Sequence, residues 1–141
     1  MKYLKLIPVF LVIMAIISCS GGNNTGNNDE NSAGPGKAEI FFNTLEHDFG
    51  TVTEGEKVAC VFKYENRGTA DLVILEATTS CGCTIPKFND EPVAPGEEGT
   101  IEVVFDTSNR SGVQYKSIEL KSNATERVAV LRITADIITN N

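Results

Sequence analysis

The sequence has no tryptophan and one histidine, His47, among its 141 residues. It also lacks the short motifs that carry enzyme chemistry: the G-x-S-x-G nucleophile turn, the H-E-x-x-H metal helix and the glycine-rich phosphate loop. Asp48-Phe49-Gly50 matches a kinase tripeptide, but the chain is too short and the other kinase motifs are missing. A Cys–His nucleophile would need His47 beside a cysteine, which nothing in the spacing supports. We therefore predict that the protein is not an enzyme and holds no cofactor.

Basic side chains are scarce. The chain has 12 Lys and Arg against 19 Asp and Glu, for a formal net charge of −7. Nucleic-acid binding depends on Lys and Arg side chains that neutralise phosphates. The composition therefore predicts no nucleic-acid partner.

The chain has one long apolar run, LIPVFLVIMAII from Leu6 to Ile17, which is shorter than the roughly 20 residues of a membrane-spanning helix. Lysines precede this run and small residues follow it, so residues 1–18 have the pattern of a signal peptide. The sequence IISC that ends at Cys19 resembles the lipobox of bacterial lipoproteins, in which the cysteine is acylated. We expect a lipid at Cys19 to anchor the protein to a membrane of the bacterial cell envelope, on the periplasmic face or the cell surface. The alternative is an ordinary signal peptide with a chance cysteine.

Residues 19–37 have almost no apolar side chains after Cys19 and read SGGNNTGNNDENSAGPGK from Ser20. Such a segment cannot bury enough surface to offset its ordering entropy, so we predict a flexible tether. Residues 38–141 are then the folded domain, of a size that holds one hydrophobic core.

Alternation of apolar and polar residues with a period of two dominates this domain. The alternation is clearest in VACVFKYEN from Val58, TIEVVFD from Thr100 and RVAVLRITADII from Arg127, and shorter strands are expected near Ile40, Phe49, Ile74 and Ile118. Turn residues such as Asn66-Arg67-Gly68 and Pro95-Gly96 separate these runs. About seven strands in about 100 residues predict an all-β protein, an immunoglobulin-like antiparallel β-sandwich, with a small closed barrel as the alternative.

Three cysteines remain if Cys19 is acylated, so at most one disulfide can form within the chain. Cys60 alternates with the inward-facing apolar residues of its strand, and we interpret it as a buried free thiol. Cys81 and Cys83 flank Gly82 between a strand and Pro86, which predicts a turn or strand end at the rim of the sandwich.

Three interpretations of Cys81 and Cys83 remain open. The two residues can form a disulfide if the chain turns at Gly82, and such a small ring is a candidate for thiol exchange with a redox partner. They can bind a soft metal ion such as copper(I) or zinc, with His47 as a possible third ligand, although a structural zinc site needs four ligands. They can also be two packed thiols with a structural role, or one of them can pair with Cys60.

The phrases LEHDFGTVTEG, FKYENRGTADLVI, TSCGCTIP, VAPGEEGTIEVVFD and LKSN occur in this order between about Phe41 and Ile137. Together they resemble the bacterial domain-of-unknown-function family 1573. The resemblance implies an immunoglobulin-like fold related to the ASH, MSP and PapD-like domains, often on lipid-anchored or periplasmic chains, and no established function. Cys60 departs from the resemblance, because an ordinary apolar residue is expected at that position.

These observations together predict a lipid-anchored binding or scaffolding module of the cell envelope. It would bind a protein partner through the sandwich surface or through an edge strand, as PapD-like relatives do. The alternative is a protein that handles thiol redox chemistry or a soft metal through Cys81 and Cys83.

Overall fold

The domain consists of strands joined by turns, and the computed structural model describes residues 36–139. The eight strands are β1 (Ile40–Phe42), β2 (Glu46–Thr53), β3 (Lys57–Asn66), β4 (Ile74–Thr79), β5 (Thr84–Phe88), β6 (Glu98–Asp106), β7 (Gly112–Ser122) and β8 (Val128–Ile138). No helix in this described range is long and apolar enough to cross a membrane. The predicted signal peptide, the acylation site at Cys19 and the tether lie outside the described residues.

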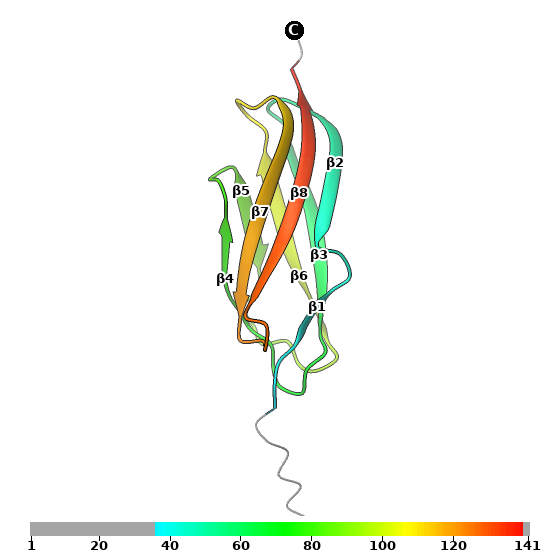
Figure 1. The fold of residues 1–141 in the computed structure, drawn as a ribbon, viewed down its shortest axis with the longest axis vertical. Coiled ribbons are helices and arrows are strands. Elements are labelled where there is room, and N and C mark those ends of the chain that lie inside the picture. Colours follow the sequence, from blue (N-terminus) through cyan, green and yellow to red (C-terminus); the bar gives the residue numbers. More distant parts are fainter. Residues whose placement is uncertain (1–35, 140–141) are drawn as a thin grey trace, which may run out of the picture. The chain divides into compact units, whose positions relative to one another are not determined.

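The strands form two sheets of four, packed face to face (Figure 1). The first sheet has the order β1-β3-β6-β5 and the second the order β2-β8-β7-β4. All neighbouring strands are antiparallel except β2 and β8, which are parallel. The prediction of a β-sandwich is confirmed and the closed barrel is excluded, because the two sheets are separate.

Two details differ from the sequence prediction. The chain has an eighth strand, β5, which the sequence pattern does not predict because it contains Pro86, and proline weakens the signal of a strand. The pairing of the second strand also differs from the predicted antiparallel arrangement: β1 belongs to one sheet, whereas β2 crosses to the other and pairs with β8 in parallel. This crossing leaves β1 only three residues long.

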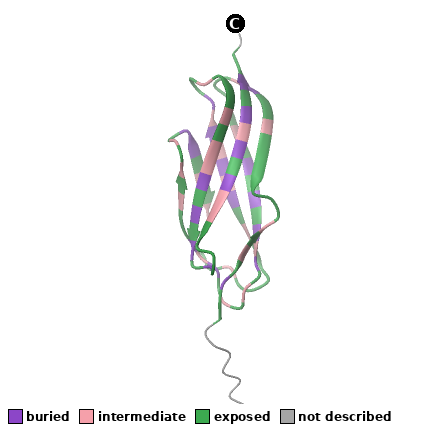
Figure 2. Cartoon of the chain, viewed as in Figure 1, coloured by how far each residue is buried: buried purple, intermediate pink, exposed green. Residues whose placement is uncertain are grey.

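The core lies between the sheets and is made by alternate residues of each strand. Figure 2 shows this alternation of buried and exposed positions along β7 and β8. The predicted inward residues of β6 and β8 are confirmed: Ile101, Val103, Phe105, Leu131, Ile133, Ala135 and Ile137 are all buried, and Ala129 packs against them. On β3, Phe62 and Tyr64 are buried as predicted, so the register of the central strands follows the apolar pattern.

A buried asparagine fixes the turn that follows β3. Asn66 has an exposed fraction of 0%, and its side-chain nitrogen donates to the carbonyl oxygens of Ala70 and Val93, each at 2.8 Å. Its side-chain oxygen accepts from the main-chain N–H groups of Gly68 at 3.0 Å and Glu39 at 3.4 Å. These four bonds use the full capacity of the amide, so Asn66 joins three segments of the chain without leaving a buried polar atom unpaired.

Candidate functional sites

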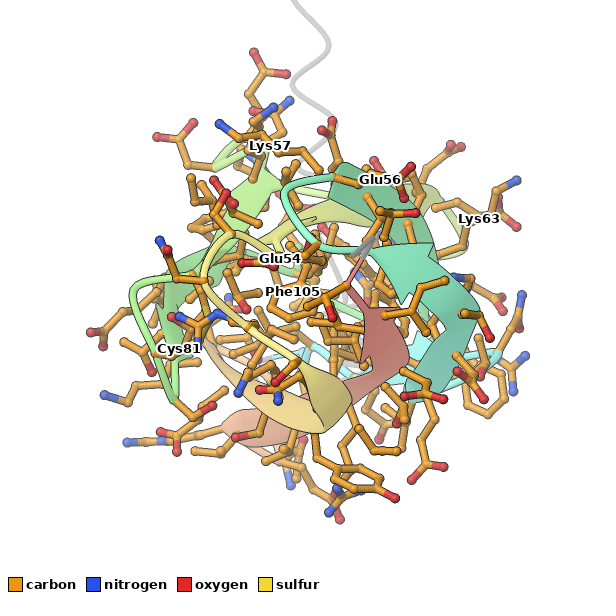
Figure 3. The ribbon with its side chains drawn as sticks, turned by 90° about the horizontal axis from the view of Figure 1, so that it is seen from above. Glu54, Glu56, Lys57, Lys63, Cys81 and Phe105 are labelled. Carbon is orange, nitrogen blue, oxygen red and sulfur yellow. A yellow bond between two sulfur atoms is a disulfide. The ribbon has the colours of Figure 1, made fainter. Side chains whose placement is uncertain are left out.

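Cys81 and Cys83 form a disulfide in the crossover that carries the chain from β4 in one sheet to β5 in the other. The sulfur atoms are 2.01 Å apart and the Cα atoms 5.4 Å apart. Figure 1 places this crossover at the end of the domain where β8 ends, opposite the end at which the chain enters β1. Viewed from that end, Cys81 lies at the periphery and Phe105 near the middle (Figure 3).

Hydrogen bonds hold both cysteines in place independently of the bond between the sulfur atoms. The hydroxyl of Thr79 donates to the carbonyl oxygen of Cys81 at 2.6 Å, and the N–H of Asp106 donates to that of Cys83 at 2.9 Å. The hydroxyl oxygen of Thr84, a buried residue, lies 3.7 Å from the sulfur of Cys81 and 3.9 Å from that of Cys83. The crossover therefore has a fixed backbone and a hydroxyl group that faces both sulfur atoms.

Cys60 is separate from this pair. It is a free thiol with an exposed fraction of 8%, in agreement with its inward position in the β3 pattern. Burial disfavours the thiolate and raises the pKa of Cys60 to about 11. Because the thiolate is the reactive form, Cys60 acts as a small apolar core residue, and neither Cys81 nor Cys83 pairs with it.

The structure does not bring His47 to the cysteines, so the suggestion that it supplies a third metal ligand is wrong. His47 lies on β2, and β8 and β7 separate β2 from β4 within the sheet. Its ring packs edge-on against Phe49, with 4.6 Å between the ring centroids. Within residues 36–139, no group of three or more His, Cys, Asp or Glu side chains is placed to hold a metal ion.

The second candidate site is a strand edge, because strands at sheet edges present unpaired main-chain groups that can accept another strand. Most edges here carry a feature that opposes pairing. The strand β1 is very short, β2 has a register shift at Gly50, and β4 has one between Ile74 and Glu76. Just before β5, the carbonyl group of Cys83 bonds to β6. Main-chain groups face alternate sides along a strand, so the nitrogen of Pro86 faces the open side, and it carries no hydrogen to donate.

The edge of β3 beyond β1 is different. β3 is ten residues long, but β1 pairs only with its last part, Tyr64–Asn66. Successive residues of an antiparallel strand direct their main-chain N–H and C=O groups to alternate sides. The N–H of Asn66 donates to Glu97 on the β6 side, and that of Arg67 donates to Glu39 on the β1 side. Odd-numbered residues of β3 therefore face the side where β1 lies.

Four residues have main-chain groups on that side beyond the end of β1: Lys57, Ala59, Val61 and Lys63. The last three are the ones nearest to β1. Within residues 36–139, no strand pairs with this stretch of β3 on that side. The chain that would continue β1 has crossed to the other sheet, where the carbonyl of Leu45 accepts from the N–H of Arg132. We call residues 57–63 the open edge; its backbone is regular, with uninterrupted pairing to β6 on the opposite side.

Apolar side chains lie beside the open edge on the outer face of the same sheet. Ala59 pairs with Val104 of β6, which in turn pairs with Ile85 of β5, so the three form one row across the sheet. Val61 and Ile85 have exposed fractions of 57% and 56%. We call Ala59, Val61, Ile85 and Val104 the outer-face patch. An added strand would extend this patch as well as the sheet.

Charges frame the open edge. Lys57 forms an ion pair with Asp106, with a nitrogen–oxygen distance of 3.4 Å. Lys63 is exposed and forms no ion pair within residues 36–139. Lysine at a strand edge opposes the addition of most strands. An acidic residue in the facing position forms a favourable cross-strand pair with it, so Lys63 selects for such a partner.

The sequence motifs predict the cysteine site but not this edge. The alternation predicts strands in the β1 region and in β3, but it does not indicate that β1 ends after Phe42. The polar pair Asn43-Thr44, which directly follows IFF, was the available signal for an early end of β1.

Comparison with known proteins identifies the family. The family described as "Protein of unknown function (DUF1573)" matches residues 40–137. The match covers more than half of the chain, so the protein belongs to this family, as the resemblance in its motifs implied. No curated protein matches the sequence at a significant level.

Solved structures confirm the immunoglobulin-like fold. The ASH/PapD-like domain 7 of human CEP192 aligns with a TM-score of 0.62 and 8% identity, over 94% of this chain and 99% of that domain. A protein of unknown function from Porphyromonas gingivalis W83 aligns with a TM-score of 0.60 and 16% identity, over 72% of this chain and 46% of its own. The VesB protease of Vibrio cholerae aligns with a TM-score of 0.57 and 20% identity, over 71% of this chain and 32% of its own. This chain thus spans less than half of the two bacterial proteins, and at these identities the likeness concerns the fold alone.

Proposed function

We propose that this protein is a lipid-anchored module of the bacterial cell envelope that binds an extended segment of a partner protein along the open edge of β3. The single observation that carries the proposal is the unpaired, regular backbone at Ala59, Val61 and Lys63. The family and the immunoglobulin-like fold are consistent with a binding or scaffolding role. The lipobox at Cys19 and the tether support the anchor.

The side chains beside the open edge define the chemistry of the partner. Directly opposite residues of paired strands place their side chains on the same face. The residue opposite Val61 would therefore join the outer-face patch and should be apolar, and the residue opposite Lys63 should be acidic. The segment would run antiparallel to β3, in line with β1, and its own N–H and C=O groups would bond to those of Ala59, Val61 and Lys63.

Site-specific photocrosslinking tests this proposal in the native envelope. A photoreactive amino acid replaces Val61 in the full-length protein, and a matched variant carries it at Tyr115, which is more exposed at 75%. We expect a discrete adduct from position 61, at a yield at least about tenfold above that from position 115, because a bound strand has a long residence time and chance encounters do not. The crosslinked partner peptide should carry an apolar and an acidic residue two positions apart, since Val61 and Lys63 lie two positions apart on β3.

A proline variant then distinguishes strand addition from simple contact. With the photoreactive group at Ala59, Val61→Pro should reduce the adduct by about tenfold or more, because proline removes the N–H that the added strand needs. Val61→Thr keeps this N–H and should keep the adduct. If Val61→Pro does not fold, Lys63→Glu replaces it, and charge reversal should also reduce the adduct. Equal yields from positions 61 and 115, or an adduct that survives both Val61→Pro and Lys63→Glu in folded protein, would contradict the proposal.

A further inference from the structure

We propose that the Cys81–Cys83 disulfide is a thiol-exchange site that accepts electrons from a partner dithiol, and that the sulfur of Cys81 is the one attacked. The site is at the β4–β5 crossover, on the opposite edge of the sandwich from β1 and β2, so it is independent of strand addition at β3. Three features of the described residues carry the proposal: the unequal exposure of the two cysteines, main-chain hydrogen bonds that do not depend on the disulfide, and a hydroxyl group near both sulfur atoms.

Access differs between the two cysteines. Cys81 is partly exposed, whereas Cys83 has an exposed fraction of 8% and belongs to the core cluster. Gly82 is exposed between them, and a Cβ atom built on it would meet no atom within 4 Å apart from its two chain neighbours. A thiolate can therefore approach the crossover from solvent and reach Cys81, while the body of the domain covers Cys83.

The disulfide contributes little to the stability of the fold. It links residues only two positions apart, and a ring of this size removes little conformational freedom from the unfolded chain. The carbonyl groups of both cysteines are already held, one by the hydroxyl of Thr79 and the other by the N–H of Asp106. After reduction these two bonds keep the thiols close together, so the ring can close again by an intramolecular step.

The buried hydroxyl of Thr84 is placed to assist bond cleavage. A disulfide sulfur has no hydrogen, so the hydroxyl is the donor, and its single hydrogen is shared between the sulfur of Cys81 at 3.7 Å and that of Cys83 at 3.9 Å. When the bond breaks, negative charge develops on the sulfur of Cys83, and a hydrogen bond from Thr84 stabilises it. A leaving thiolate of lower basicity departs faster, so Thr84 acts as a positioning residue for the exchange.

The exchange balances in two steps. One thiolate of the partner attacks the sulfur of Cys81, a new sulfur–sulfur bond forms, and the electron pair of the old bond leaves on the sulfur of Cys83. The second thiolate of the partner then attacks the partner's first sulfur in the mixed disulfide and releases Cys81 as a thiolate. The partner dithiol is oxidised to a disulfide, and this protein gains two electrons and, after protonation, two thiols.

The experiment uses the full-length acylated protein with glutathione as a monothiol probe, followed by rapid alkylation and peptide mass spectrometry. We expect glutathione on Cys81 at least about tenfold more often than on Cys83, since attack requires access to the sulfur. Buried Cys60 is the internal control and should remain unmodified in folded protein. A disulfide that resists excess dithiothreitol until the domain unfolds, or equal modification of Cys81 and Cys83, would overturn the proposal.

Variants that keep only one of the two cysteines compare their reactivities in the absence of the disulfide. Cys83→Ser leaves Cys81 free and should form a mixed disulfide with oxidised glutathione at least about tenfold faster than Cys81→Ser, which leaves Cys83. Thr84→Val should slow reduction of the native bridge about fivefold and raise the pKa of the Cys83 thiol in the reduced protein, and Thr84→Ser should restore both. A Thr84→Val protein with an unchanged rate and an unchanged Cys83 pKa would contradict the role given to Thr84.

Discussion

Replacing Asn66 with alanine is expected to lower the free energy of unfolding by about 3 kcal/mol, because it removes four hydrogen bonds that a fully buried amide makes to the main chain. The amide accepts from the N–H groups of Gly68 and Glu39 and donates to the carbonyls of Ala70 and Val93. Water cannot replace it easily, since Asn66 has an exposed fraction of 0%. In a domain of about 100 residues this loss corresponds to a fall in Tm of about 15 °C, measured by thermal and urea unfolding.

Asn123 provides the matched control for Asn66. Its side chain also bonds to two main-chain groups, accepting from the N–H of Val73 at 2.8 Å and donating to the carbonyl of Asp71 at 2.9 Å. Asn123 is exposed, so water can take its place, and Asn123→Ala should cost only about 1 kcal/mol. Equal losses for the two variants would show that burial does not set the contribution of Asn66.

Gly68→Ala is expected to lower the free energy of unfolding by about 2 to 3 kcal/mol through a clash with the main chain. A Cβ atom at this position would collide with the carbonyl oxygen of Lys37 and lie 2.6 Å from the nitrogen of Glu39. These atoms cannot move freely, because the same carbonyl accepts from the N–H of Thr69 at 2.7 Å. The segment that leads into β1 would have to separate from the end of β3, and urea unfolding measures the cost.

Gly82→Ala is the control for the loss of a glycine. A Cβ atom there would meet nothing within 4 Å apart from its two chain neighbours, and Gly82 is not among the glycines with positive φ. Its free energy of unfolding should change by less than about 0.5 kcal/mol. If Gly68→Ala were equally neutral, the close packing at the start of β1 would not be a constraint on the fold.

The sandwich could be predicted from the sequence because burial in a two-layer β protein follows the alternation of side chains. The apolar inward residues of β3, β6 and β8 were identified from this alternation, whereas the buried Asn66 at the end of β3 was not. The pattern failed where it was short or interrupted. The sequence pattern did not predict β5 because Pro86 interrupts it. It did not predict the parallel pairing of β2 with β8 because this pairing depends on where the chain crosses between the sheets, which alternation does not encode.

The two candidate sites were predictable to different degrees. The spacing of Cys81 and Cys83 around Gly82 marked the crossover, because a turn there can bring the two residues together. Their unequal access depends on packing against β6 and could not be derived from spacing. The open edge exists because no strand pairs with residues 57–63 of β3 on that side in the described part of the chain. The residues of β3 themselves therefore do not predict it. The prediction that His47 supplies a third metal ligand was wrong because two strands separate β2 from β4 in the sheet. This strand order cannot be read from sequence spacing.

Amide hydrogen exchange along β3 tests the open edge most directly. In the isolated protein, the N–H groups of Ala59, Val61 and Lys63 should exchange at least about 100-fold faster than those of Cys60 and Phe62, which bond to β6. In the presence of native envelope extract, the three fast amides should become protected while the other two remain unchanged. If the odd-numbered amides were already protected in the isolated protein, or stayed fast in the extract, β3 would not be the edge at which a partner strand is added.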